Sequence, residues 1–276
     1  MSTEMLRQEE PQVIALCGPG GGGKSRLTLN LAAELSLCTP RVLVIDADPQ
    51  NSIAQEMRLP APVLASLDAN HHTLGAAIIN RVPLLNCVTP SSPAFIFAGQ
   101  QIPPLELSLA TRLHSKLALE ALAGEVGQMR EQFEFTLIDC SPTLSALTCA
   151  LLWSTDLFIV PSRLRSTQLL GLCEFLRQLR VAKRMGPPNP YSIWLLPNRP
   201  GAEWQATAHE VQVRDSGYLQ GHPIQVLAPI PERDAATPFS LENVTDLTAP
   251  FTLSRRPPHP DYQDLMTRLS FQLPDT

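Results

Sequence analysis

A run of glycines that ends in lysine and serine is the part of this sequence best suited to chemistry. Residues 18–25 read Gly-Pro-Gly-Gly-Gly-Gly-Lys-Ser, which fits the G-x-x-x-x-G-K-S/T pattern of phosphate-binding loops. Glycines let backbone N–H groups turn toward phosphate oxygens. The lysine would neutralise the β- and γ-phosphates, and the serine hydroxyl would ligate Mg²⁺. The pattern predicts nucleotide contacts from Gly18, Gly20, Gly21, Gly22, Gly23, Lys24, Ser25 and Arg26.

The segments on either side of the glycines support this interpretation. Residues 13–17 form an apolar run typical of a buried parallel strand, and Leu27, Leu31 and Leu35 have helical spacing. We expect that helix to run to about Ser36, with the positive end of its dipole at the loop. A flexible glycine linker is the alternative, but linkers are not usually flanked by a buried strand and an amphipathic helix.

Two carboxylates follow the next apolar run. Residues 41–45 predict a second buried strand, and Asp46 and Asp48 come directly after it. The carboxyl ends of parallel strands form the usual ligand edge of an open sheet. The side chains can therefore face a magnesium-bound nucleotide, and the alternative is a capping and turn role before Pro49.

Length, composition and pattern indicate the class of protein. The chain has 276 residues, 44% of them apolar, with a net charge of −5. Alternating strand and helix patterns predict an α/β fold with a doubly wound, mostly parallel sheet and helices on both faces. Residues 1–11 are expected to be a flexible arm, and 12–276 a single domain. The acidic start is not a signal peptide. The six scattered cysteines include no C-x-x-C pair, which predicts reduced thiols in a cytoplasmic protein.

Between the second strand and residue 133 the patterns are weaker. They predict a short helix at 74–79, strands at 84–88 and 94–98, and one long helix from Leu105 to Met129 that packs on the sheet. His71 and His72 fall in a polar segment, which we interpret as a solvated loop rather than a metal site.

A later helix, expected over residues 169–185, carries several basic residues. Their spacing predicts one basic face that could contact DNA phosphates, and the alternative is an ordinary solvated helix face. The last predicted helix, 261–271, has a single arginine, whereas a membrane-binding helix should be basic on its polar face. No stable membrane anchor is therefore expected. The candidate DNA-binding residues are Arg177, Arg180, Lys183 and Arg184.

The glycine loop followed by Asp-Ala-Asp-Pro-Gln at 46–50 resembles the deviant P-loop ATPases of the ParA/MinD family. These proteins partition plasmids and chromosomes and position cellular cargo. Further segments match the family's order over roughly residues 12–270. They resemble its Walker B strand and switch, its next core strand, a strand that ends in an adenine-contacting asparagine, and a nucleotide-side loop, at 133–144, 156–161, 193–199 and 226–233.

The resemblance implies a site that uses ATP or ADP with Mg²⁺. Lys24 and Asp48 would be the catalytic residues, with Asp48 orienting the attacking water. Ser25 would ligate the metal, Asp139 would hold it through water, and Asp46 would support its shell. The implied nucleotide contacts outside the loop are Asn198, Pro231 and Arg233.

One position departs from the family pattern. ParA/MinD proteins carry a second lysine early in the loop, which reaches the phosphates of the partner chain, and here that position is Pro19. The missing charge could come from another cation. Otherwise the dimer closes without it and hydrolyses slowly, or the protein binds nucleotide and is a poor ATPase. The candidate cations are Lys116, Arg163 and Arg165.

Two functions follow from the resemblance. In the first, ATP binding drives a homodimer that binds non-specific DNA on the nucleoid, and a ParB-like or other adaptor protein stimulates hydrolysis and release. In the second, the chain is a nucleotide-gated scaffold that recruits a membrane or envelope machine without DNA, as in cellulose-synthesis relatives. Iron–sulfur reductase relatives are disfavoured because no cysteine pair is placed to bridge a cluster.

Overall fold

A computed structural model describes residues 12–111, 115–216, 223–231, 238–241, 244–248 and 262–269. The predicted arm at 1–11 lies outside the described residues.

Seven parallel strands form one sheet in the described part of the chain, in the order β3-β2-β4-β1-β5-β6-β7. β1 lies in the middle, between β4 and β5, so chain connections leave it toward both edges of the sheet. The predicted parallel α/β fold is confirmed. The strands are β1 (Gln12–Leu16), β2 (Val42–Ala47), β3 (Ala94–Ile96), β4 (Phe135–Cys140), β5 (Leu157–Ser162), β6 (Ser192–Pro197) and β7 (Ile224–Val226).

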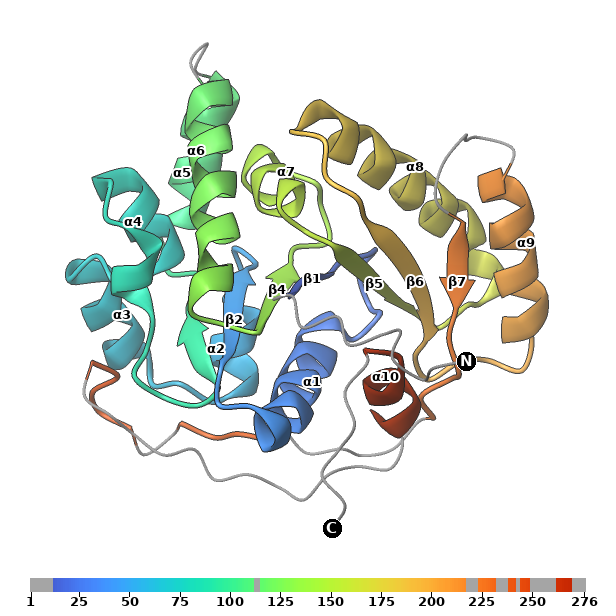
Figure 1. Ribbon diagram of the computed structural model, residues 1–276, viewed down its shortest axis with the longest axis horizontal. Coiled ribbons are helices and arrows are strands. Elements are labelled where there is room, and N and C mark those ends of the chain that lie inside the picture. The colour runs from blue at the N-terminus through green and yellow to red at the C-terminus, as the bar shows by residue number, and fades with distance from the viewer. Residues whose placement is uncertain are drawn as a thin grey trace, which may run out of the picture.

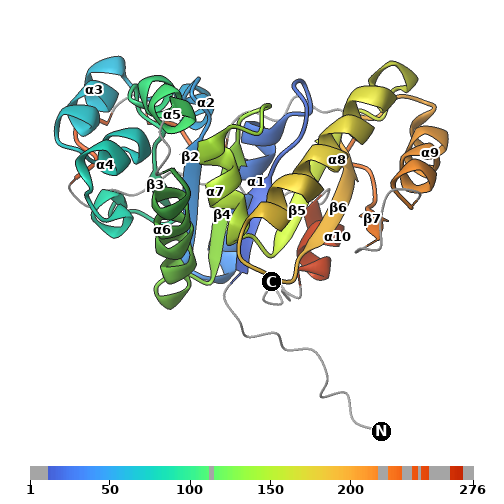
Figure 2. The same cartoon turned by 90° about the horizontal axis from the view of Figure 1, so that it is seen from above.

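Helices cover both faces of this sheet (Figures 1 and 2). One face carries α4 to α9, and the other carries α1, α2, α3 and α10. The helices are α1 (Lys24–Cys38), α2 (Ser52–Glu56), α3 (Ala61–Ala69), α4 (Leu74–Asn80), α5 (Ile102–Thr111), α6 (Ser115–Gln128), α7 (Ala146–Trp153), α8 (Leu169–Met185), α9 (Trp204–Ser216) and α10 (Gln263–Arg268).

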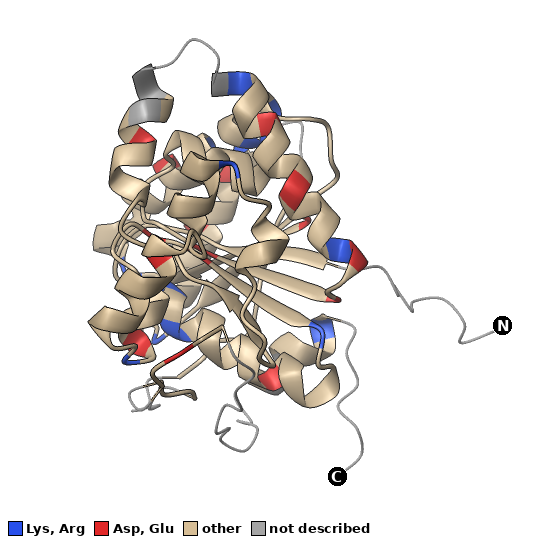
Figure 3. Ribbon diagram, turned by 90° about the vertical axis from the view of Figure 1, so that its left-hand side faces the viewer, with Lys and Arg blue, Asp and Glu red and all other residues tan. Residues whose placement is uncertain are grey.

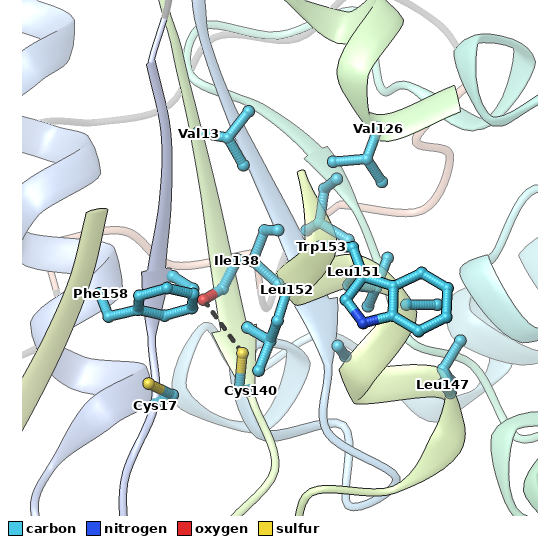
Figure 4. Packing of buried hydrophobic residues seen from close by; sticks show 14 of the residues in the cluster. Val13, Cys17, Val126, Ile138, Cys140, Leu147, Leu151, Leu152, Trp153 and Phe158 are labelled. Carbon is cyan, nitrogen blue, oxygen red and sulfur yellow. Dashed lines mark hydrogen bonds between the residues drawn. The ribbon is translucent and has the colours of Figure 1, made fainter. Parts of the chain in front are cut away.

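The two cores follow from the alternation of side chains along the strands. Val13 and Ala15 of β1 enter one core, and Ile14 and Leu16 enter the other. In the first core, Val13 and Phe158 of the sheet lie near side chains of α7, among them Trp153 (Figure 4). Because both faces of the central strands are covered, these strands read in sequence as continuous apolar runs.

Two element predictions in the middle of the chain are wrong. Leu84–Cys87 is a short 3-10 helix and not a strand. It begins after Pro83, and the N–H of Leu84 donates to the side chain of Glu125 instead of to a strand partner. The predicted helix 105–129 is two helices, α5 and α6. Leucines at helical spacing occur in both helices, and residues 112–114 between them lie outside the described residues.

The strand at 94–98 is confirmed in shortened form as β3, and the helices at 74–79 and 169–185 are confirmed as α4 and α8. Among the described helices, none is long and apolar enough to span a membrane.

Candidate functional site

The glycine loop connects β1 to α1 and packs against the end of β5. A Cβ atom on Gly22 would lie 2.3 Å from the carbonyl oxygen of Pro161, so only glycine fits there. Gly23 has a φ of 80°, in the left-handed region that favours glycine, and forms the N-cap of α1. The side-chain amide of Asn198, just after β6, donates to the carbonyl oxygen of Gly22 at 2.8 Å. The loop is thus held by two neighbouring strand ends.

Lys24 is the cation inside the loop. Its side chain is buried, and Nζ donates to the carbonyl oxygen of Gly18 at 3.0 Å. This bond holds the ammonium group across the loop. A buried, fixed positive charge beside backbone amides and the N-terminus of α1 is suited to bind phosphate.

Asp139 is the penultimate residue of β4 and lies directly beside Asp46 of β2 in the sheet register. Its side chain is fully buried, and Oδ1 accepts from the Thr28 hydroxyl at 3.3 Å. Burial raises the pKa of Asp139 to about 7, although the Ser25 hydroxyl and the Lys24 charge both act to lower it. Its second oxygen, Oδ2, is buried with no hydrogen-bond partner among the described residues. An orphaned carboxylate oxygen beside a serine hydroxyl fits a hydrated Mg²⁺.

The other two carboxylates organise the turn after β2. Asp46 accepts from the backbone N–H groups of Asp48 and Ile53, at 3.1 and 3.2 Å. Burial and the neighbouring Asp139 charge raise the pKa of Asp46 well above its usual range. Asp48 accepts from the Gln50 N–H and the Ser52 hydroxyl, at 2.9 and 2.8 Å. Both therefore have the turn role given above as the alternative, and their roles toward magnesium and water stay predictions.

A pocket of about 400 Å³ opens over the glycine loop. That volume lies within the range of small-molecule sites. Asp48 lines it near the loop, and Asn198 and Pro231 line it on the side of β6 and the segment that follows β7. The structure therefore brings most of the predicted residues to one site. Gly18, Asp46 and Asp139 are buried and not part of the lining, and Arg233 lies outside the described residues.

The pocket also includes residues that the sequence did not indicate. Glu56 of α2 lines it and pairs with the predicted contact Arg26 at 3.1 Å. Tyr262, next to α10, lines it from the far end of the chain. Thr28 could have been found, because it lies one helical turn after Lys24 on the same face of α1. No local pattern links Tyr262 to the loop.

The predicted basic face on α8 is wrong for two of its four residues. Arg180 is 2% exposed and pairs with Asp215 of α9 at 2.5 Å. Lys183 is 4% exposed, and its Nζ donates to three carbonyl groups at the end of α7. Arg177 and Arg184 are exposed, and Arg177 pairs with Glu174 on the same helix.

A glycine loop between the first strand and helix of a parallel sheet, with an aspartate at the end of an adjacent strand, defines a P-loop nucleotide-binding protein. The family described as AAA domain (AAA_31) matches residues 12–189. Together with relatives named as partition proteins, this match places the chain in the ParA/MinD family of P-loop ATPases.

The similar sequences include partition proteins and proteins without an assigned role. The chain is 29% identical to the chromosome partitioning protein ParA of Caulobacter vibrioides, over 68% of this chain and 67% of that protein. It is also 29% identical to an uncharacterized protein of Pseudomonas putida, over 64% of this chain. The match spans 65% of the length of that relative.

The solved structures confirm the fold. A McdA–ATP complex from Cyanothece has a TM-score of 0.64 at 18% identity, covering 82% of this chain and 85% of that one. Cobyrinic acid a,c-diamide synthase from Mycobacterium smegmatis, with an ATP analogue and magnesium, has a TM-score of 0.64 at 20% identity. It covers 82% of this chain and 89% of that one.

Proposed function

We propose that the chain is a ParA-like ATPase that binds Mg-ATP, forms a homodimer and binds DNA non-specifically. It partitions or positions a plasmid, a chromosome or a protein cargo, and a ParB-like or other adaptor protein stimulates its hydrolysis. The observation that carries the proposal is the buried Asp139 Oδ2, unpartnered among the described residues, beside Ser25 at a lysine-bearing glycine loop.

The site offers each group that ATP hydrolysis needs. Lys24 and the loop amides bind the phosphates, and Asp48 orients the attacking water. Ser25 would hold Mg²⁺, with Asp139 acting through water and Asp46 supporting the metal's shell. The metal, when bound, neutralises charge that develops on the phosphate oxygens. The bound ATP in the McdA complex, and the ATP analogue and magnesium in the synthase, support this ligand choice.

The first test is binding and turnover of Mg-ATP by the native protein and by Lys24→Ala. Loss of the fixed ammonium should abolish most binding and all turnover. Lys116→Ala is the matched control for binding, because Lys116 is an exposed lysine on α6 that pairs with Glu120 and lies outside the pocket lining of its own chain. A native protein that takes up neither Mg-ATP nor Mg-ADP in calorimetry would refute the proposed function.

DNA binding is tested by mobility shift on random duplex with ATP, with ADP and without nucleotide. We expect binding with ATP only. Such binding would support the proposed localisation on the nucleoid in the cytoplasm. The exposed arginines of α8 are the candidates that remain, so Arg177→Ala with Arg184→Ala should weaken the shift. Equal binding in all three nucleotide states, or none in any, would contradict this part of the proposal.

A second function is favoured by the burial of Arg180 and Lys183, which leaves α8 with less exposed basic charge than the sequence suggested. The net charge is −5, and Figure 3 shows acidic and basic residues interspersed on the side of the molecule that it presents. The chain would then be a nucleotide-gated scaffold for a membrane or envelope machine. ATP-dependent capture of a membrane complex, with no DNA shift, would favour this function.

A further inference from the structure

The cations that line the nucleotide pocket are Lys24, Arg26, Arg163 and Arg199. The first three differ in what they already contact. Lys24 bonds to the carbonyl oxygen of Gly18, and Arg26 pairs with Glu56. Arg163 lines the same pocket, is half-buried, and has no acidic partner among the described residues. A guanidinium group held at a pocket wall without a carboxylate is available to a bound anion.

The backbone around Arg163 is fixed at the end of β5. The carbonyl oxygen of Ser162 accepts from the Asn198 N–H at 2.8 Å, and that of Arg163 accepts from the Gly201 N–H at 3.2 Å. The next residue, Leu164, is fully buried with a φ of 49°. Leucine rarely adopts this left-handed conformation, and such strain is found most often where function requires a particular chain direction.

The same strand end touches the phosphate loop. Pro161, two residues before Arg163, supplies the carbonyl oxygen that a Cβ on Gly22 would meet at 2.3 Å. Asn198 pairs with the β5 end through its N–H and with the Gly22 carbonyl through its side chain. Arg163 therefore extends from a segment that is in contact with the glycine loop.

We propose that Arg163 binds the terminal phosphates of a nucleoside triphosphate in the pocket of its own chain, as a second cation beside Lys24. The inference rests on the proposed function. The uncharged Pro19 leaves Lys24 as the one cation within the loop sequence, and a triphosphate carries more negative charge than one ammonium neutralises. The planar fork of arginine suits two phosphate oxygens at once.

The test measures the affinity of Arg163→Ala for Mg-ATPγS, Mg-ADP and adenosine by calorimetry. Loss of a charged hydrogen bond predicts about ten-fold weaker ATPγS binding or more, a smaller loss for ADP, and no change for adenosine. Arg163→Lys should recover part of the loss, because it keeps the charge without the fork. A purely structural role would weaken all three ligands alike.

Arg214→Ala is the control, because Arg214 is an exposed arginine of α9 that pairs with Glu210 and lies outside the pocket lining. Unchanged ATPγS affinity in Arg163→Ala, or an equal loss in Arg214→Ala, would overturn the assignment. Native binding of ATPγS would in either case leave the proposed function intact. A native protein that binds no triphosphate would overturn both.

Mixing two variants tests whether Arg163 contributes to the pocket of its own chain or to the pocket of a partner chain. Arg163→Ala and Lys24→Ala chains are combined, and turnover is compared with each alone. If Arg163 serves its own pocket, every site in a mixed dimer lacks one cation, and mixing restores nothing. Recovery of turnover on mixing would show that Arg163 reaches the partner's site and would overturn the assignment to its own chain.

Discussion

The glycines of the phosphate loop meet different physical requirements at neighbouring positions. A Cβ on Gly20 would find no atom within 4 Å, whereas one on Gly22 would meet the backbone of Pro161. The conflict at Gly22 involves a strand carbonyl that cannot turn aside as a flexible side chain could. Space, and not only backbone freedom, therefore fixes the residue type at Gly22.

We expect Gly22→Ala to lower the free energy of unfolding by about 1–3 kcal/mol, the usual range for overpacking a well-packed site. Gly20→Ala, at the open position of the same loop, should leave the free energy of unfolding nearly unchanged. Urea denaturation of both variants measures the difference. Equal stabilities would show that the loop and β5 are not held together as described.

At the residue scale, the sequence predicted which residues of the glycine loop lie together at the site, because the spacing of the loop pattern fixes their relative positions. Lys24, Ser25 and Asp48 line one pocket, as their positions at the loop and at a strand end indicate, and their roles stay predictions. A turn role for Asp46 is the alternative that the sequence leaves open. Its partners could not be identified from the sequence, because one of them is the backbone N–H of Ile53, seven residues along the chain. Arg233 stays a prediction.

Among the elements, α8 shows where pattern reading succeeded and where it failed. Its bounds at 169–185 agree with the prediction. Residue type alone predicts that its charged residues face the solvent. However, Leu172, Leu176 and Leu179 form a buried stripe, and Lys183 continues that stripe at helical spacing. The position of a basic residue relative to the apolar stripe was the better guide to its burial.

The two arginines on this helix should differ sharply in their effect on stability. Arg180→Ala leaves Asp215 without its buried partner, so we expect a loss of about 3–5 kcal/mol. Arg177→Ala removes an exposed pair with Glu174 that solvent screens, so we expect a much smaller loss of stability. Chemical denaturation of both variants, monitored by circular dichroism, checks the contrast. Similar losses would place Arg180 in a more solvated setting than its contacts indicate.

Lys183 gives α8 a pH-dependent contribution to stability. Burial lowers its pKa from 10.5 to about 8, so between these values the unfolded chain binds the proton more tightly than the folded one. The unfolding free energy due to this group therefore rises with pH through that window. We expect the stability of the native protein relative to Lys183→Met to increase from pH 8 to pH 10 in urea titrations. A constant or falling difference would contradict the lowered pKa.

On the scale of the whole molecule, the sheet was predictable because its central strands are buried on both faces and read as apolar runs. The structure of the region between β2 and β4 was less predictable from the sequence. The 3-10 helix at Leu84–Cys87 is short and apolar, and such runs do not distinguish strand from helix by periodicity.

The pocket draws on α1, β5, β6 and the segment at Tyr262, so a ligand should stabilise the molecule as a unit. At a concentration one hundred times its Kd, Mg-ATPγS should add about 2.7 kcal/mol to the free energy of unfolding. The shift should be absent in Lys24→Ala and present in Lys116→Ala. Thermal melts with and without ligand measure it, and a shift that persists in Lys24→Ala would place the ligand elsewhere.

Tyr262 forms part of the pocket wall, and it is synthesised long after the glycine loop. While the chain is being synthesised, the phosphate-binding end of the cleft has all its parts once β6 has emerged. Tyr262 joins the pocket only when α10 packs on the face of the sheet that also carries α1. A nascent chain would therefore bind its ligand in two stages, first through the phosphates and more tightly once Tyr262 has joined the pocket.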